Sequence, residues 1–139
     1  QVGDVPTGCE SNFIVAVTNT QQNDVKYPSA GYGLRSVDLG APGTGIISTL
    51  PGSSYGALTG TSMATPHVAG AIGLLHHVAS PMFYNKYMAK PAEGALIMKA
   101  ALLQGVDQLP SLKNVTVSGG RLNVAKSAQL LINYQGRSR

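Results

Sequence analysis

An apolar run from Ser62 to Ala79 constrains the fold of this chain more than any other feature. Its hydrophobic residues recur at helical spacing, at Ala64, Val68, Ala71, Ile72, Leu75 and Val78. The remaining faces carry further small or apolar residues, namely Ala69, Gly70, Gly73 and Leu74. Because a helix that is apolar on nearly every side is buried inside a domain, the run predicts a long central helix covered by other elements.

Short segments on either side of this run complete the predicted architecture. Strands are predicted at residues 12–17, 36–39, 46–47, 55–58 and 115–117. These segments are apolar or β-branched and are bounded by turn residues. Residues 18–33 are polar and turn-rich and predict a surface loop. Pro91 opens a second predicted helix that ends at Gly105, and Asn123 caps a third that runs through Ile132. Strands followed by buried helices predict a layered α/β domain.

Composition excludes several classes of protein. The chain has 139 residues, 43% of them hydrophobic and 12% charged, which favours one folded domain over a disordered chain. Its net charge of +4 is scattered, and it has no Trp and two Phe, so it lacks the basic, aromatic pattern of nucleic-acid binding. The single cysteine, Cys9, excludes an internal disulfide and a multi-cysteine metal site. No apolar run reaches the roughly 18 residues of a membrane span.

Ser62 stands between a turn at Gly60 and the apolar helix, where a serine is well placed to act as a nucleophile. The free N–H groups and the dipole at a helix N-terminus stabilise a developing oxyanion. Gly60 permits a close approach that a side chain would block, and Thr61 is a candidate cap for the helix. The alternative is structural, because a serine at the start of a helix is commonly only a cap or first-turn residue.

A nucleophilic serine also needs a base and a group that orients the base. His67 lies five positions after Ser62 and therefore does not share its helix face. His76 and His77 lie roughly 20 Å further along the same helix. Asp4 and Asp24 precede the serine, but no histidine does. The chain therefore presents a candidate nucleophile without a base.

An α/β-hydrolase also carries its serine at a strand-to-helix turn. That class needs the motif G-x-S-x-G, followed by an acid and then a histidine. Here Ala64 stands at the fifth position, and no histidine follows Asp107. Both departures exclude the α/β-hydrolase reading.

The eleven residues GTSMATPHVAG, 60 to 70, resemble the nucleophile signature of the subtilisin family, the subtilases. Further segments resemble strands and turns that the family places before its serine, at residues 12–17, 32–33, 37–43 and 47–49. Downstream, GGRLNV at 119–124 resembles the motif that opens the last helix of the family. The resemblance thus spans roughly residues 12 to 126, far more than an isolated G-T-S.

This resemblance implies a partial subtilisin-like fold, with parallel sheet strands followed by a buried central helix and two further helices. It implies a serine endopeptidase that hydrolyses polypeptides through an acyl-enzyme on Ser62, with the Ser62 N–H as one oxyanion donor. His67 matches a histidine that the family carries for packing. The implied location is secreted or extracellular. No cofactor is required, although the family allows structural calcium in the full domain.

In subtilases the triad residues follow the chain order Asp, His, Ser, so both partners of the serine lie upstream. The Asn that supplies the second oxyanion donor lies upstream as well. Residues 1–139 therefore resemble the C-terminal portion of a subtilase catalytic domain. The expected partner is the missing N-terminal half or a second copy of this chain. Alone, the chain is expected to be inactive. It is also expected to expose an apolar face, because the strands around Val15 and the helix that holds Val68 and Ile72 lose their neighbours.

Three other residues are candidate sites. Asp38 matches an Asp that some subtilases use in a weak cation site, although an Asp that holds a turn by accepting backbone N–H bonds is the favoured interpretation. Asn114, in Asn-Val-Thr, is a glycosylation sequon. Cys9 is a candidate reactive thiol, although a free cysteine is more often a small buried residue.

Two hypotheses from different classes remain. In the first, the chain is the nucleophile-bearing part of a secreted serine endopeptidase and is active when joined to its N-terminal half. In the second, it is a catalytically inert fragment that acts as a structural or self-associating module. An upstream sequence that carries an Asp and a His in subtilase motifs would support the first hypothesis, and its absence from the natural gene product would support the second.

Overall fold

A computed structural model describes residues 8–136, so Asp4 lies outside the described part of the chain. Along these described residues the elements are, in order, β1 (Val17–Thr20), β2 (Leu39–Pro42), β3 (Ile46–Leu50), β4 (Ser54–Leu58), α1 (Thr61–Val78), α2 (Pro81–Ala89), α3 (Pro91–Gln104), β5 (Asp107–Gln108), β6 (Gly120–Arg121) and α4 (Val124–Ile132). Within residues 8–136, no helix combines the length and apolar character needed to cross a membrane.

Within the described residues, four strands form the main sheet in the order β1-β2-β6-β5. β1 and β2 run parallel, with Val17 opposite Leu39 and Thr20 opposite Pro42. β6 is parallel to β2, and the short β5 is antiparallel to β6. This arrangement confirms the predicted α/β fold with parallel strands before the central helix. Among the described residues, β1 forms one end of the sheet.

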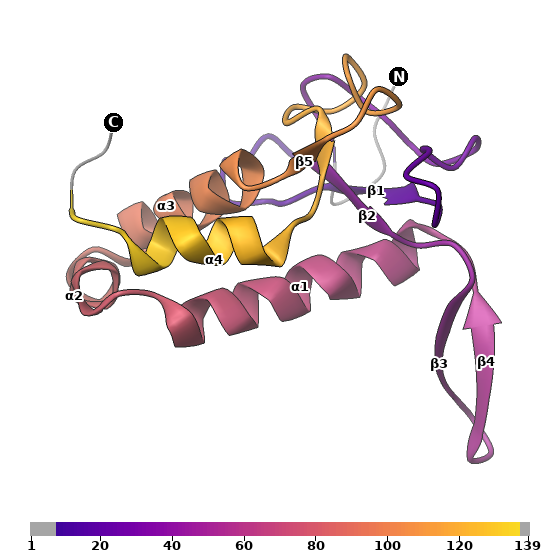
Figure 1. Cartoon of the computed structure of the whole chain (residues 1–139), viewed down its shortest axis with the longest axis horizontal. Coiled ribbons are helices and arrows are strands. Elements are labelled where there is room, and N and C mark those ends of the chain that lie inside the picture. The colour runs from indigo at the N-terminus through magenta and orange to yellow at the C-terminus, as the bar shows by residue number, and fades with distance from the viewer. Residues whose placement is uncertain (1–7, 137–139) are drawn as a thin grey trace.

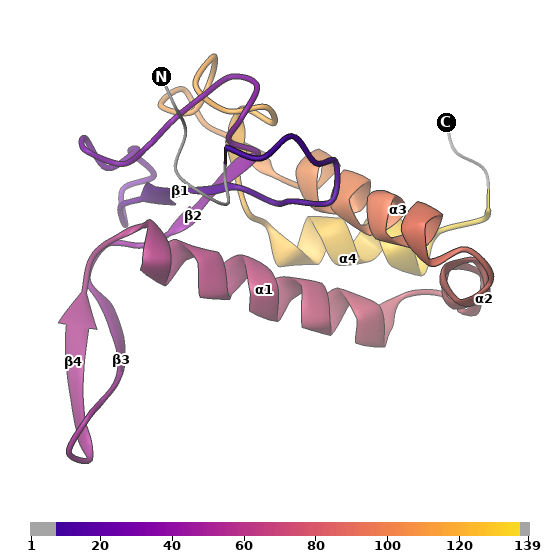
Figure 2. The same ribbon diagram turned by 180° about the vertical axis from the view of Figure 1, so that it is seen from behind.

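β3 and β4 form a separate antiparallel hairpin with Ile46 opposite Leu58. The hairpin projects from the body of the molecule beyond the start of α1 (Figures 1 and 2). Several of its apolar side chains are open to solvent, with Ile47 74% and Tyr55 75% exposed. The strands predicted at 46–47 and 55–58 are therefore confirmed, but they lie outside the main sheet.

The helices pack together beside the sheet. α1 lies against β1 and β2, while α4 lies against both α1 and α3 (Figure 1). The core between them consists mainly of Leu39, Ala41, Ala64, Val68, Leu75, Phe83, Met98, Leu102, Leu122 and Leu131. Alternation along β2 directs Leu39 and Ala41 into this core, whereas a Cβ at Gly40 would meet Leu112.

The position of α1 agrees with the prediction, but its burial does not. Only one stripe is buried, at Ala64, Val68, Ala71 and Leu75. Ala69, Gly70, Gly73 and Leu74 are exposed, because the described elements cover α1 from one side only. The exposed side agrees with the expectation that the helix holding Val68 and Ile72 lacks neighbours, although Val68 itself is buried and Ile72 is partly buried.

Two predicted strands are displaced along the chain. The strand predicted at 12–17 is observed at Val17–Thr20, and the strand predicted at 36–39 is observed at Leu39–Pro42. The polar residues Thr18, Asn19 and Thr20 are almost fully buried, although the sequence predicted a surface loop from residue 18. Parallel pairing with β2 brings these residues into the sheet, and hydrophobicity alone did not reveal that pairing.

Two further differences concern the C-terminal half. Residues 115–117 form a turn region, and the strand follows at Gly120–Arg121. A fourth helix, α2, was missed, so three helices follow α1 instead of two. Its signal is a Ser-Pro pair: Ser80 Oγ caps the helix by accepting from the Phe83 N–H at 3.2 Å, and Pro81 opens its first turn.

Charged groups around Arg121 hold β5, β6 and α4 together. The Arg121 guanidinium contacts Asp24 at 2.7 Å and Asp107 at 3.2 Å. Asp107 also accepts from Lys126 at 2.7 Å and from the amide of Asn123. The hydrogen bond from Lys126, followed by that from Asn123, lowers the pKa of Asp107 below its ordinary value of 3.8.

The lowered pKa of Asp107 predicts a contribution to stability that depends on pH. Because the folded-state pKa lies below the unfolded one, this contribution is complete above the unfolded pKa near 4 and is lost as pH falls through the folded pKa. Asp107→Asn should therefore lower the melting temperature at pH 7 and reduce its fall between pH 5 and the acid limit. Circular dichroism melts against pH measure both effects.

Glu10→Gln is the control, because Glu10 is exposed and lies outside this network. An acid-side decline that is the same in Asp107→Asn and in the unsubstituted chain would contradict the prediction.

Candidate active site

Ser62 lies exposed in the first turn of α1. The N-cap is Gly60, which has no side chain, and its carbonyl oxygen accepts from the N–H groups of Met63 at 3.1 Å and Ala64 at 3.3 Å. The prediction that Thr61 caps the helix is wrong, because Thr61 is already the first helical residue. The hydroxyl of Ser62 thus stands at an open helix start.

Backbone hydrogen bonds fasten this helix start to the carboxyl ends of β1 and β2. The Gly43 N–H donates to the Thr20 carbonyl at 3.1 Å, and the Gly60 N–H donates to the Gly43 carbonyl at 2.8 Å. Ser62 therefore lies beyond the carboxyl edge of two parallel strands. This edge is where α/β sheets commonly bind their ligands.

Gly43 is indispensable to this junction on steric grounds. A Cβ at this position would lie 2.6 Å from the Gly60 carbonyl oxygen and 2.6 Å from Asn19 Oδ1. Real Cβ atoms do not approach other atoms so closely, so one of the three segments would have to move. The glycine therefore sets the distance between β1, β2 and the start of α1.

Asn19 adds a buried polar group beside the same junction. Its Oδ1 accepts from the Thr44 hydroxyl at 3.1 Å, while its Nδ2 is buried and unpartnered within residues 8–136. A buried donor without a partner costs about 1–3 kcal/mol, so Asn19 marks a place where this chain alone is not fully satisfied. Sequence reasoning assigned Asn19 to a loop, and no local pattern revealed its burial.

The electrostatics at Ser62 favour negative charge. The first N–H groups of a helix have no intrahelical partner, and the helix dipole adds a partial positive charge there. The first turn of α1 carries no acidic residue that would oppose this field. The site can therefore stabilise an oxyanion that forms beside Ser62.

The three histidines of the chain are engaged elsewhere. His67 Nδ1 contacts the Met63 carbonyl oxygen at 2.9 Å on the exposed side of α1. His76 lies in the last turn, where its ring packs edge-on against Tyr87 at 5.0 Å and near Phe83. His77 shares that last turn. None of these contacts of His67 and His76 involves Ser62.

Carboxylates upstream and downstream of Ser62 are paired with cations. Asp24 binds Arg121, and Asp107 binds Arg121 and Lys126. Asp38 Oδ2 accepts from the Ala16 N–H at 2.8 Å, which confirms that this Asp holds the backbone. Asp38 Oδ1 lies 3.0 Å from Lys99 Nζ, a contact that sequence reasoning did not foresee.

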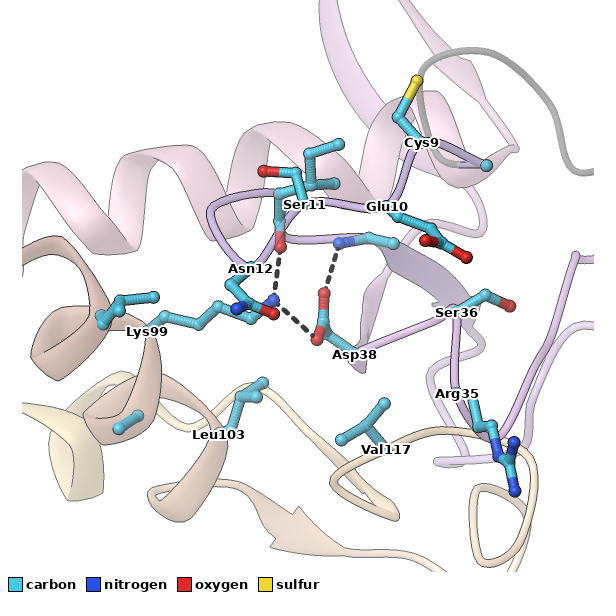
Figure 3. A pocket seen from close by; sticks show the side chains of 15 residues that line it. Cys9, Glu10, Ser11, Asn12, Arg35, Ser36, Asp38, Lys99, Leu103 and Val117 are labelled. Atoms are coloured by element: carbon cyan, nitrogen blue, oxygen red, sulfur yellow. Dashed lines mark hydrogen bonds and ion pairs between the residues drawn. The ribbon is translucent and has the colours of Figure 1, made fainter. Parts of the chain in front are cut away.

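A cavity of about 830 Å³ surrounds Asp38 and Lys99 (Figure 3). Its walls come from the residues before β1, the segment before β2, α3 and Val117, and its lining residues include none from α1. This cavity is therefore separate from the site at Ser62. Among residues 8–136, no group of three or more His, Cys, Asp and Glu side chains is arranged to hold a metal ion.

The remaining candidates lie on the surface. Cys9 is exposed, contrary to the expectation of a buried thiol. Asn114 is exposed in a turn with φ of 64°, a conformation that Asn tolerates better than most residues. Thr116, the third residue of the sequon, is buried and accepts from the Gly119 N–H at 3.0 Å.

Comparison with known proteins places this arrangement in a family. A sequence description of the subtilase family matches residues 2–129. The chain belongs to the subtilase family. Thermitase from Thermoactinomyces vulgaris is 39% identical over 115 residues, which cover 83% of this chain and 36% of thermitase. Subtilisin E from Bacillus subtilis is 49% identical over 70 residues, which cover 50% of this chain and 18% of that protein.

Solved structures agree with the assignment to the subtilase fold. The CspB protease of Clostridium perfringens superposes with a TM-score of 0.71 at 23% identity, over 94% of this chain and 29% of that one. The prenylagaramide maturation protease PagA superposes with a TM-score of 0.66 at 22% identity, over 91% of this chain and 45% of that one. The chain thus spans less than half the length of these subtilase relatives.

The glycine junction yields a testable prediction. Gly43→Ala should lower the free energy of unfolding by about 1–3 kcal/mol, because overpacking forces the strand ends and the helix start apart. Urea unfolding followed by circular dichroism measures the loss. Gly31→Ala is the matched control, since a Cβ there would meet no atom within 4 Å. Equal stability of the two variants would show that the junction tolerates a side chain.

Proposed function

We propose that residues 1–139 form the C-terminal portion of the catalytic domain of a subtilisin-like serine endopeptidase, in which Ser62 is the nucleophile. The observation that carries this proposal is the position of Ser62. It is exposed at the open start of α1, beyond the carboxyl edge of parallel strands, inside the family signature at residues 60–70. An N-terminal portion carrying the Asp and the His completes the triad.

The proposed reaction is acyl transfer to water. Ser62 Oγ attacks the peptide carbonyl carbon while the His of the N-terminal portion takes the hydroxyl proton. The new Oγ–C bond forms, the carbonyl oxygen becomes an oxyanion, and the N–H groups at the start of α1 donate to it. The C–N bond then breaks, and the leaving amine receives the proton from the His. Water hydrolyses the acyl-enzyme and frees Ser62.

The exposed side of α1 supports the proposed N-terminal partner. A Cβ at Gly70 or Gly73 would meet no atom of another described segment within 4 Å, so packing among residues 8–136 does not explain the two glycines. Glycine within a helix costs about 0.5–1 kcal/mol relative to Ala. A partner whose backbone approaches α1 closely would require such small residues, and it would also cover the exposed Leu74.

The edge of the sheet supports the same partner. β1 forms one end of the sheet among the described residues, and the unpartnered Asn19 Nδ2 belongs to that strand. A strand edge next to an uncovered apolar helix is a surface that proteins normally pair or cover. We propose that the N-terminal portion adds to this edge and packs on Ala69, Gly70, Gly73 and Leu74. The proposed setting is extracellular, as the family resemblance implies.

Reconstitution tests the catalytic role of Ser62. The chain alone should hydrolyse a peptide p-nitroanilide at no more than about one part in 10,000 of the rate of a complete subtilase, because a serine without its His loses most of its catalytic power. Co-expression with an N-terminal portion of the kind found in thermitase should restore turnover, and Ser62→Ala should abolish it. Ser53→Ala, on the exposed hairpin, is the matched control.

Full activity of the isolated chain that depends on Ser62 would show that this chain holds a base of its own. Failure to gain activity with an N-terminal portion, together with a well-defined dimer in sedimentation, would favour the self-associating structural module instead.

The exposed glycines give a second test of the partner. Gly73→Leu should leave the free energy of unfolding of the isolated chain unchanged or raise it slightly, since the position is open and Leu is a better helix former. In the reconstituted complex it should reduce activity at least tenfold, because the added side chain separates the partner from α1. Gln129→Leu on α4 adds an equally exposed Leu and should have no effect on activity.

A further inference from the structure

Lys99 stands where the resemblance to subtilases suggested a cation at Asp38. Its ammonium group comes from α3, lies 3.0 Å from Asp38 Oδ1 and also donates to the carbonyl oxygen of Ile14 (Figure 3). A carboxylate and a backbone carbonyl are the oxygen ligands that calcium prefers. Here both oxygens face an ammonium group of the same chain.

The pair is well enclosed compared with the other ion pairs of the chain. The side chains of Lys99 and Asp38 are 19% and 12% exposed, whereas those of Lys126 and Asp107 are 61% and 28% exposed. Asp38 is held on its other side by two hydrogen bonds with Ala16, one through Oδ2 and one through its own N–H. The carboxylate is therefore fixed, and Oδ1 is directed at Lys99.

These residues do not fit an added calcium ion while Lys99 is present. Calcium needs six to eight oxygen ligands, and the positive charge of Lys99 stands against the carboxylate oxygen that would bind it. The ammonium also joins three segments that a bound ion would otherwise join, namely α3, the residues before β1 and the residues before β2.

We propose that the Lys99 ammonium is a built-in cation that replaces a bound metal ion at Asp38. The chain then gains no stability at this place from added calcium. Removal of the charge by Lys99→Met converts the place into a calcium site. In that variant, Asp38 Oδ1 and the Ile14 carbonyl supply protein ligands, and the open cavity of about 830 Å³ admits the water that completes the shell.

Thermal unfolding in calcium chloride tests this proposal. For the unsubstituted chain, 10 mM calcium chloride should change the melting temperature by no more than about 1 °C relative to EDTA. Lys99→Met should melt several degrees lower in EDTA and recover by about 3–8 °C in calcium chloride. The double variant Lys99→Met/Asp38→Asn should show no recovery. Potassium chloride at equal ionic strength separates calcium binding from screening.

Lys126→Met is the matched control, because it removes an ammonium from Asp107 while Arg121 and Asn123 still hold that carboxylate. It should show no change in melting temperature on addition of calcium.

If Lys99→Met folds only when calcium is present, the proposal is supported, and if it folds in neither condition, the proposal is rejected. Calcium stabilisation of the unsubstituted chain that disappears in Asp38→Asn would also overturn it.

Discussion

The junction at Gly43 is the constraint on which the site depends. Two backbone hydrogen bonds, from Gly43 to Thr20 and from Gly60 to Gly43, connect β1, β2 and the start of α1. Because Gly43 has no Cβ, the three segments can approach closely enough for these bonds to form. The same contacts place the open turn of α1 beyond the carboxyl edge of the sheet. Backbone contacts therefore determine the position of Ser62.

The rest of the chain supports this junction from one side only. Ala64, Val68, Ala71 and Leu75 anchor α1 to the sheet and to α4. The opposite side of α1 carries the small residues Ala69, Gly70 and Gly73, which are exposed, and β1 forms one end of the sheet among residues 8–136. Both features accord with the N-terminal partner that we propose for this side of the molecule. The chain covers 36% of thermitase and 29% of the CspB protease.

Ion pairs join segments of the chain at the edges of the molecule. Arg121 joins the loop at Asp24 to β5 and β6, and Lys99 joins α3 to the segments before β1 and β2. Both basic groups connect parts of the chain that are far apart in sequence, so they stabilise the tertiary arrangement of the chain and not single elements. At Lys99, the proposed exclusion of calcium follows from this charge, because an internal cation competes with a bound one for the same oxygen atoms.

The sequence by itself determined the family, the helix at Ser62 and the absence of a histidine before the serine. The signature at residues 60–70 is local, and helical spacing and capping residues such as Asn123 act within a few residues, so each can be read along the chain. Tertiary structure decided the rest. The burial of Asn19, the one-sided cover of α1 and the pairing of Lys99 with Asp38 depend on contacts between segments distant in sequence. No local pattern records them, because burial and pairing are set by which segments meet in space.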